Sequence, residues 1–486
     1  MKRYLLALLA ALLVLLGALA AYNYRHDALG IVNTDFSVRR YGVAQRFVKM
    51  RYILDNPEKY DAFCFGSSRV AKIPVGELDG GDACWYNFTY GAGLPNEWRE
   101  DIEMLLAHGV KIRRLIIGLD DMSFRMDPAL NETGGGTNFA YRPHDVERYL
   151  RTLFRRPDKP LPTDFAARES ILFDIYGKGY TSYPWVDEAI DADPAAHRAD
   201  PAFQRLTVYR GSAHMDDALD ELRAIRDIAD AHGIELTVII NPIYAWTYLA
   251  NDQASLAAFQ RRLASITGYY DFSGVNDITA DEMNYYESSH FRPQVGRRIL
   301  ARIAGGAPEG PQGFGALVTA ADVDAHLAQQ AAVRDAFLAA HPGELERRLR
   351  QTAFVAGLPN AFQGTPDGML GVHLDRINEK APAKDIEIAW PEEQPFGCSG
   401  WQAAEGGTAA VCTNEDTGEI WAMYAKNTAS AGAAASLGLP EDAKIGFELH
   451  TVGGTLPSGR WALTLRTRTP GGALLASPVL AHILVP

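Results

Sequence analysis

Two short segments carry residue types that can perform acyl transfer together. Ser68 lies in the sequence Gly66-Ser67-Ser68, directly after an apolar run that is typical of a buried strand. Glu287 precedes His290 by three residues, a spacing at which a carboxylate can orient an imidazole as general base. We therefore predict Ser68 as nucleophile, His290 as base and Glu287 as orienting acid. Ser67 is the alternative nucleophile, because the turn offers two hydroxyls.

The backbone near this serine offers candidates for donating to a developing oxyanion. Gly91 follows the predicted strand 83–88, and a glycine allows a backbone N–H to approach a reacting oxygen closely. The backbone N–H groups of Ser68 and Gly91 are the candidate donors.

The apolar run 234–242, the strongest predicted strand, leads into three weaker candidates for lining a substrate crevice. Asn241 stands at the end of this strand, and Tyr244 and Trp246 follow it. Ligands bind at the carboxyl ends of strands in an open parallel sheet. The two aromatic rings could stack on sugars, and ordinary packing is the alternative interpretation.

These segments occur in the order that is typical of SGNH (GDSL-like) hydrolases, and residues 55–305 resemble that superfamily. Residues 66–68 stand where the family has Gly-Asp-Ser, and residues 87–91 resemble its glycine-bearing second block. Residues 116–121 fall where the family carries Gly-x-Asn-Asp, and residues 287–290 fall where it carries Asp-x-x-His. The likeness is greatest to membrane-anchored members that modify envelope polymers, such as alginate O-acetylation and teichoic-acid D-alanylation proteins.

The resemblance implies roles for the residues that match it. Ser68, His290 and Glu287 would form the catalytic group, with Gly91 and Asp120 beside the oxyanion. Asp120 replaces the family asparagine, and an ionised Asp120 would repel an oxyanion, so it would have to be protonated or turned away. Glu287 replaces the family aspartate. Both replacements leave a weakened or non-hydrolytic site as an alternative. No metal and no bound cofactor is implied.

The predicted fold is α/β, with a C-terminal all-β sandwich and an N-terminal transmembrane helix. Strands alternate with helices over residues 25–305, which indicates a parallel sheet flanked by helices, of the SGNH (flavodoxin-like) type by resemblance. Residues 125–210 interrupt the alternation and are predicted to be an insertion. Residues 306–364 are predicted as a linker and helical segment. Residues 365–486 contain short strands at regular spacing, typical of a β-sandwich.

The N-terminal residues 1–24 predict export. Lys2 and Arg3 precede an apolar run from Tyr4 to Tyr22, which is about long enough to span a hydrocarbon core. We predict a single-pass inner-membrane anchor with a periplasmic body, and a cleaved signal peptide is the alternative. The net charge of −13 disfavours nucleic acid as a partner.

The chain has four cysteines that fall into two local pairs, Cys64 with Cys84 and Cys398 with Cys412. In an oxidising compartment each pair could form a disulfide. Buried free thiols are the alternative.

Together these features predict acyl-ester chemistry, either O-acetyl transfer or deacetylation, on an envelope or exported polysaccharide. Family analogy adds a membrane acyltransferase as a possible acyl-donating partner. The alternative is a non-catalytic, anchored glycan-binding or assembly protein on the same scaffold, which Asp120 favours. A lipid esterase is a third option, but the insertion 125–210 is too polar to support a greasy lid.

Overall fold

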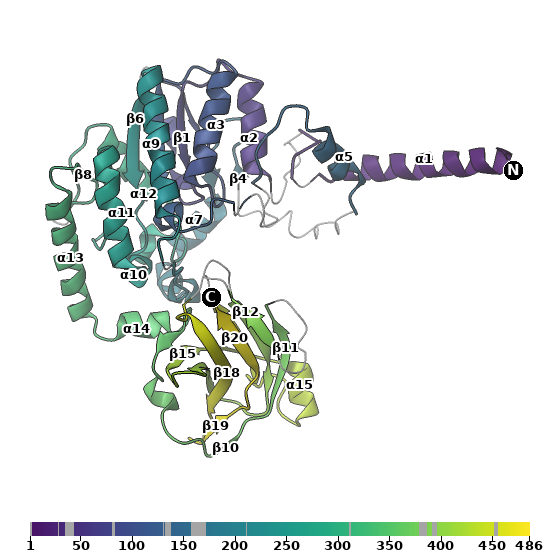
Figure 1. Ribbon diagram of the computed structural model, residues 1–486, viewed down its shortest axis with the longest axis vertical. Helices are drawn as coiled ribbons and strands as arrows, with labels where there is room; N and C mark the ends of the chain where they lie inside the picture. Colours follow the sequence, from purple (N-terminus) through teal and green to yellow (C-terminus); the bar gives the residue numbers. More distant parts are fainter. Residues whose placement is uncertain are drawn as a thin grey trace.

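A computed structural model shows an α/β domain and a C-terminal β domain, with a single helix projecting from the body (Figure 1). It describes residues 2–27, 29–34, 43–79, 83–129, 131, 138–156, 172–209, 211–310, 313–378, 386–390, 396–451 and 455–486. The predicted insertion therefore lies only partly within the described residues.

The α/β domain is built on one six-stranded sheet with the order β2-β1-β3-β6-β7-β8. Five strands are parallel and the last is antiparallel: β1 (Ala62–Gly66), β2 (Trp85–Asn87), β3 (Arg114–Leu119), β6 (Glu235–Ile240), β7 (Tyr269–Asp271) and β8 (Ala316–Val318). All residues of β1 are buried, as expected for a parallel strand that is covered on both faces. The chain order reverses between β1 and β3, and such a reversal opens a crevice at the carboxyl edge.

Helices follow the strands in alternation, as the sequence pattern predicts. A row of neighbouring helices is visible in Figure 1: α2 (Gln45–Leu54), α3 (Pro95–Ala107), α9 (Met215–His232), α11 (Gln253–Ile266) and α13 (Val323–Ala340). Another helix, α12 (Pro293–Ile303), packs on the turn that follows β1. This mixed architecture confirms the α/β prediction in its coarse form.

The C-terminal β domain consists of two sheets around one core. One sheet has the order β10-β19-β18-β14-β15-β9, with β12 and β20 beside it, and the other has the order β11-β13-β17-β16. The strands are β9 (Val355–Ala356), β10 (Gly368–Met369), β11 (Val372–Ile377), β12 (Glu387–Ala389), β13 (Phe396–Gln402), β14 (Gly407–Asn414), β15 (Ile420–Tyr424), β16 (Lys426–Thr428), β17 (Gly446–Thr451), β18 (Gly459–Arg468), β19 (Leu474–Ala476) and β20 (Ala481–Val485). Trp461 of the first sheet and Phe447 of the second lie in the same buried cluster. The predicted antiparallel strands are thus present.

In the structure, both borders of the segment predicted as linker and helical, residues 306–364, lie at other positions than predicted. β8 pairs with β7, so the α/β sheet extends beyond residue 305. β9 pairs with β15, so the β domain begins before residue 365. Strands of two or three residues are too short to show a periodic pattern, which is why the sequence did not reveal them.

Arginines of the short helix α14 (Glu344–Leu349) and directly after it donate hydrogen bonds to backbone carbonyls of both domains. The Arg348 guanidinium donates to the Phe203 carbonyl at 3.1 Å and lies 4.8 Å from the centre of the Trp246 ring. Arg350, directly after the helix, donates to the carbonyls of Gly357 and Ala422 in the β domain. These bonds hold the β domain in a defined position against the α/β domain.

All four cysteines are free thiols, so of the two possibilities that the sequence left open, the structure shows free thiols and no disulfides among them. Cys64, Cys398 and Cys412 are buried in the cores of their domains. Burial raises the pKa of the Cys64 and Cys412 thiols, so both are held in their unreactive protonated form.

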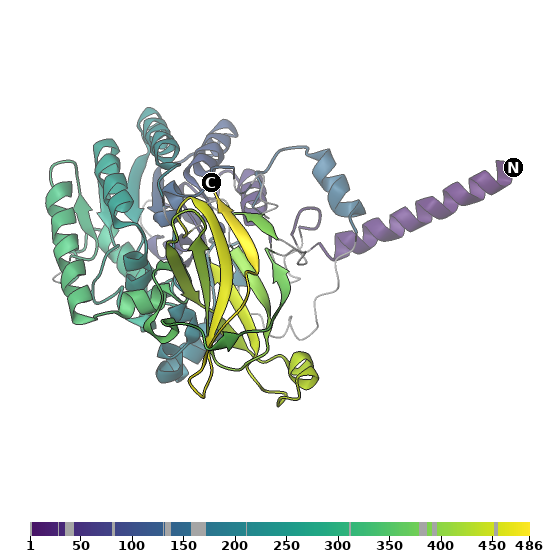
Figure 2. The same cartoon turned by 60° about the horizontal axis from the view of Figure 1, so that its bottom comes forward.

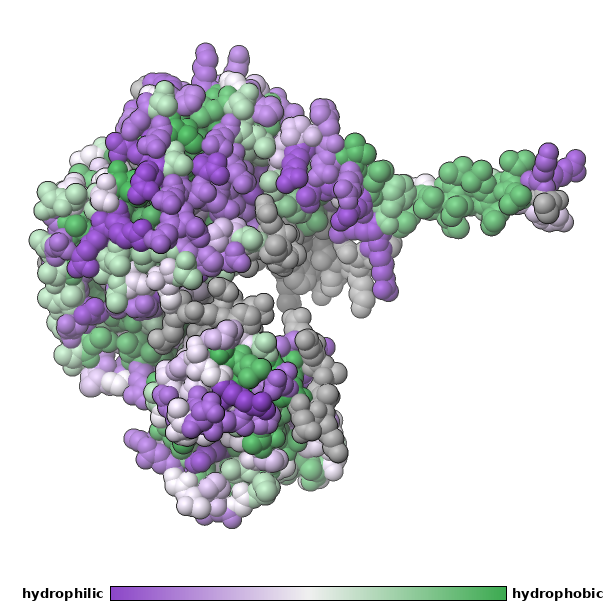
Figure 3. All heavy atoms as spheres, in the orientation of Figure 1, coloured by the Kyte–Doolittle hydropathy of each residue, from purple (hydrophilic) through white to green (hydrophobic). Residues whose placement is uncertain are grey.

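The N-terminal helix α1 (Lys2–Arg25) points away from the body in two views (Figures 1 and 2). Its 24 residues extend about 36 Å at 1.5 Å per residue. Its surface is almost wholly apolar (Figure 3), so by length and composition it could cross a membrane, although a signal sequence would pass the same test. Asn23 near its end donates to the carbonyls of Leu153 and Arg155, beside α5 (Val146–Phe154).

Candidate active site

The structure brings the three residues predicted as the catalytic group together at the carboxyl edge of the sheet. Ser68 lies in the turn after β1, and its Oγ is 2.9 Å from Nε2 of His290. Nδ1 of His290 is 2.5 Å from Oε1 of Glu287, which also accepts the His290 backbone N–H at 2.8 Å. The side chains of His290 and Glu287 are each 33% exposed, so the chain of hydrogen bonds opens to solvent.

The ionisation of Glu287 suits an orienting role. Burial raises the pKa of its carboxyl, but the hydrogen bonds from His290 and the positive charge of Arg69 outweigh burial and lower that pKa. An ionised Glu287 must accept a hydrogen from Nδ1 of His290. The Nε2 lone pair is then free to accept the Ser68 hydroxyl proton.

The Ser68 turn is compact because two glycines face each other in neighbouring strands. Gly66 and Gly118 are register partners, and a Cβ on either would lie 2.3 or 2.5 Å from a methyl group of Val70. Val70 therefore packs directly onto the strand ends. The turn continues into a short 3-10 helix, η1 (Val70–Lys72).

The hydroxyl of the neighbouring Ser67 is bonded to Asp120 and not to His290. Ser67 is 1% exposed and its hydroxyl donates to Oδ2 of Asp120 at 2.5 Å. Asp120 also accepts the Met122 backbone N–H at 2.9 Å and lies 3.3 Å from the Arg69 guanidinium. These contacts orient the Asp120 carboxylate towards Ser67 and Arg69, which corresponds to the turned-away arrangement that the sequence left open. Only Ser68 of the two serines is partly exposed.

Arg69 is a site residue that the sequence analysis missed. Its Nη1 lies 2.5 Å from Asp121 Oδ1, and its Nε donates to Ser289 Oγ at 2.8 Å. It therefore ties the end of β3 to the loop that carries His290. Burial alone would lower the pKa of Arg69, but Asp121 and Asp120 outweigh it and raise that pKa, so the guanidinium stays charged. An arginine directly after Ser-Ser, facing an Asp-Asp pair, was the available signal.

The Gly91 loop lies against the Ser68 turn. The backbone N–H of Phe88 donates to the Cys64 carbonyl at 2.8 Å, and that of Tyr90 donates to the Gly66 carbonyl at 3.5 Å. Among the described residues, the N–H groups of Ser68 and Gly91 have no acceptor. Both remain candidates for donating to an oxyanion.

Two buried side chains fix the backbone that leads into this loop. Asn87 donates to the carbonyls of Val70 and Ile73, which joins the end of β2 to the turn after Ser68. The Lys49 ammonium lies between three backbone carbonyls, those of Asn87 at 3.0 Å, Thr89 at 2.6 Å and Gly179 at 2.8 Å. These bonds limit the freedom of the residues just before Gly91.

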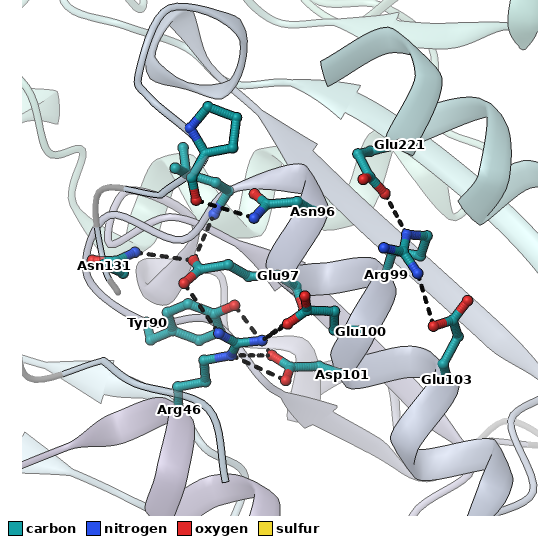
Figure 4. A network of polar contacts seen from close by, with 12 residues as sticks. Arg46, Tyr90, Asn96, Glu97, Arg99, Glu100, Asp101, Glu103, Asn131 and Glu221 are labelled. Carbon is teal, nitrogen blue, oxygen red and sulfur yellow. Dashed lines mark hydrogen bonds and ion pairs between the residues drawn. The ribbon is translucent and has the colours of Figure 1, made fainter. Parts of the chain in front are cut away.

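A buried ionic network lies behind the same loop (Figure 4). The Arg46 guanidinium of α2 faces Glu97 and Asp101 of α3, at 3.1 and 3.0 Å. Tyr90 donates to Asp101 at 3.1 Å, and the Leu94 N–H donates to Glu97 at 3.1 Å. The network thus holds both ends of the Gly91 loop through charge-assisted hydrogen bonds.

The two aromatic residues after β6 are packed in the interior, which is the alternative that the sequence left open for them. Tyr244 is fully buried and donates to Glu282 at 2.7 Å. Trp246 is 5% exposed and packs against Phe337, with ring centres 5.1 Å apart. Asn241 is also fully buried, and its amide atoms have no hydrogen-bond partner in the described part of the chain.

Metal-binding residue types do not gather in the described ranges. Within them, no three side chains of His, Cys, Asp or Glu lie close enough together to hold an ion. Glu287 and His290 are hydrogen-bonded to each other instead.

Comparison with known proteins assigns no family to the chain. No family model matches the chain, and no curated protein matches it. One solved structure that it resembles is provisionally described as a platelet activating factor from Streptococcus pneumonia, at 11% identity and a TM-score of 0.27. The likeness covers 52% of this chain and 88% of that one, and a TM-score of this size carries no argument about fold or function.

Proposed function

We propose that this protein is an SGNH-type serine esterase or O-acyltransferase. The observation that carries the proposal is the continuous hydrogen-bonded chain from Ser68 through His290 to Glu287. Such a chain activates a serine hydroxyl for attack on an acyl group. The order of the five parallel strands and the four sequence blocks support the SGNH assignment.

The proposed reaction has two acyl transfers. Ser68 Oγ attacks the ester carbonyl while His290 Nε2 takes its proton, and the N–H groups of Ser68 and Gly91 donate to the oxyanion. The C–O bond to the leaving alcohol then breaks, and His290 returns the proton to that alcohol. In the second half, water or a sugar hydroxyl attacks the acyl-Ser68 ester, loses its proton to His290, and releases Ser68.

Two features support a position at the membrane, where an envelope polysaccharide would be the substrate within reach. The first is the apolar helix α1, which would hold the body at the periplasmic face of the inner membrane, close to exported polymers and to an acyl-donating membrane protein. The second is the neighbouring helix α5, where Val146, Leu150 and Phe154 are 60%, 49% and 43% exposed. Their spacing of four residues makes one apolar stripe, which suits contact with a lipid surface.

A non-catalytic glycan-binding or assembly protein is the second candidate. Asp120, which stands where hydrolases of this class carry an oxyanion asparagine, favours it. The ion pair of Asp120 with Arg69 partly offsets this observation, because it compensates the negative charge that would repel an oxyanion.

Hydrolysis of p-nitrophenyl acetate by the full chain in detergent tests the proposal. We expect turnover in the wild type, a loss of about 10²-fold or more in Glu287→Gln, and near-background rates in His290→Ala. If a folded wild-type protein hydrolyses the ester no faster than these variants, the non-catalytic glycan-binding or assembly protein is favoured. An O-acetylated polysaccharide and its deacetylated form, offered with an acyl donor, then separate hydrolysis from transfer.

A further inference from the structure

A buried arginine joins the two segments that carry the proposed nucleophile and base. Arg69 directly follows Ser68, and it is 2% exposed. Its Nε donates to Oγ of Ser289 at 2.8 Å. Ser289 is also buried and directly precedes His290. Ser68 and His290 are thus each one residue away from an end of the same buried hydrogen bond.

The other side of the Arg69 guanidinium faces the end of β3. Its Nη1 lies 2.5 Å from Asp121 Oδ1 and 3.3 Å from Asp120 Oδ2, and both carboxylates are buried. A guanidinium is planar and has several N–H donors in fixed directions, so it can bond a hydroxyl and a carboxylate at the same time. Arg69 therefore fixes the turn after β1, the end of β3 and the loop before α12 relative to one another.

The loop that carries His290 is also held by contacts to its backbone. The Tyr286 N–H donates to the His290 carbonyl at 2.9 Å, which closes the loop. The Thr247 hydroxyl, on the short helix α10 (Ala245–Ala250), donates to the Ser288 carbonyl at 2.6 Å. Arg69 adds the bond that joins this loop to the turn after β1. The position of the His290 ring relative to the nucleophile therefore depends on that bond.

Arg69 also acts on the base through its charge. Burial raises the pKa of the Glu287 carboxyl, but the hydrogen bonds from His290 and the charge of Arg69 lower it below its ordinary value. The ionisable groups that face the guanidinium are Asp121, Asp120 and Tyr209. A positive charge beside the Glu287–His290 pair disfavours an added proton on either member of the pair. The pair therefore stays in the form that can accept the proton of the nucleophile.

We propose that Arg69 is a positioning residue for the acyl transfer. Its bond to Ser289 holds the His290 ring at Ser68. Its charge keeps the Glu287–His290 pair unprotonated at the working pH. The proposal rests on the proposed acyl-ester function and adds to that site a buried residue that does not touch the substrate. The bond and the charge can be removed separately, and each loss has its own signature.

The titration of the His290 ring tests the charge. It is followed by NMR on the full chain with isotope-labelled histidines in detergent, and the signal is assigned by its loss in His290→Ala. Arg69→Gln removes the charge and keeps an amide donor, so the pair takes up a proton more readily. We expect the midpoint to move to higher pH by about 0.5 pH unit or more. Arg69→Lys keeps the charge, so its midpoint should stay at the wild-type value.

Arg46→Gln is the matched control for this titration. Arg46 is an equally buried, carboxylate-paired arginine, but it lies in the network behind the Gly91 loop (Figure 4). We expect the His290 midpoint to be unchanged in this variant. An unchanged midpoint in Arg69→Gln, or an equal shift in Arg46→Gln, would overturn the role of the Arg69 charge.

Ser289→Ala tests the bond and leaves the charge and both carboxylate contacts in place. We expect kcat for p-nitrophenyl acetate to fall about tenfold or more, because the imidazole is less well placed, while the NMR midpoint is unchanged. Ser289→Thr keeps the hydroxyl and should restore most of the rate. A wild-type kcat in Ser289→Ala would overturn the role of the bond, even if Arg69→Gln does not fold. Absence of hydrolysis in the wild type would count against the proposed function, and the NMR titration would still decide the role of Arg69.

Discussion

The carboxyl ends of β1 and β6 look alike in sequence and differ in the structure. Each is a buried strand followed by polar or aromatic residues, and both were predicted to line the site. After β1, Ser68 is partly exposed and bonded to His290. After β6, Asn241, Tyr244 and Trp246 are all buried.

The difference shows that the position after a strand does not decide the role of a side chain. Ser67 and Ser68 share the same turn, yet one is bound to Asp120 and the other reaches His290. Tyr244 and Trp246 are covered by Glu282 and by helix α13. We expect the residues after β1 to act in catalysis and those after β6 to stabilise the fold. The following variants test this difference.

Ser68→Ala should have the largest effect. We expect esterase activity to fall by about 10³-fold or more, because the acyl-accepting oxygen is removed. The free energy of unfolding should change little, since Ser68 is partly exposed. Initial rates and thermal unfolding of the same preparation measure both, and retained activity would assign the nucleophile elsewhere.

Trp246→Ala should have the opposite profile at the end of β6. Removing a buried tryptophan costs about 3–5 kcal/mol of the free energy of unfolding. Activity per folded molecule should remain near the wild-type value, because the ring does not reach the site. Denaturant unfolding with rates normalised to the folded fraction measures this. A large loss of activity without destabilisation would place Trp246 at the substrate after all.

Ser67→Ala should have a smaller effect and sharpen the contrast between the two serines. The buried Asp120 carboxylate loses a donor, which costs about 1–3 kcal/mol. Activity should persist, and Ser67→Thr, which keeps the hydroxyl, is the control. Loss of activity as complete as in Ser68→Ala would favour the alternative nucleophile.

Tyr244→Phe should have the smallest effect. The variant keeps the buried ring and loses one hydrogen bond to Glu282, which contributes about 0.5–1.5 kcal/mol. Turnover of acetylated polysaccharide should be unchanged. A rise in KM for the polymer without a change for p-nitrophenyl acetate would show that the hydroxyl contacts sugar.

Much of the site could be predicted from the sequence because it lies in local patterns. Apolar runs followed by Gly-Ser-Ser or Asp-Asp mark strand ends, and the Glu287–His290 spacing is local. The partners of these residues could not be predicted, because they depend on tertiary contacts. Arg69 with Asp121, and Lys49 with the carbonyls before Gly91, join residues that are distant in the chain or carry no motif.

The predictions of the domain borders and of the crevice-lining residues were inaccurate for a related reason. β8 and β9 are too short for a periodic signal, and their pairing with β7 and β15 is non-local. Trp246 is buried because α13 and α14, which lie in the segment predicted as linker and helical, pack over it. Tyr244 is buried against Phe203 and Tyr285.

The most direct test is covalent labelling of the full chain with a fluorophosphonate, followed by mass spectrometry of the tryptic peptides. We predict a single adduct on Ser68, which is absent in Ser68→Ala and His290→Ala and retained in Ser67→Ala. No adduct in a folded wild-type protein, or an adduct on Ser67, would contradict the assignment of Ser68 as an activated nucleophile.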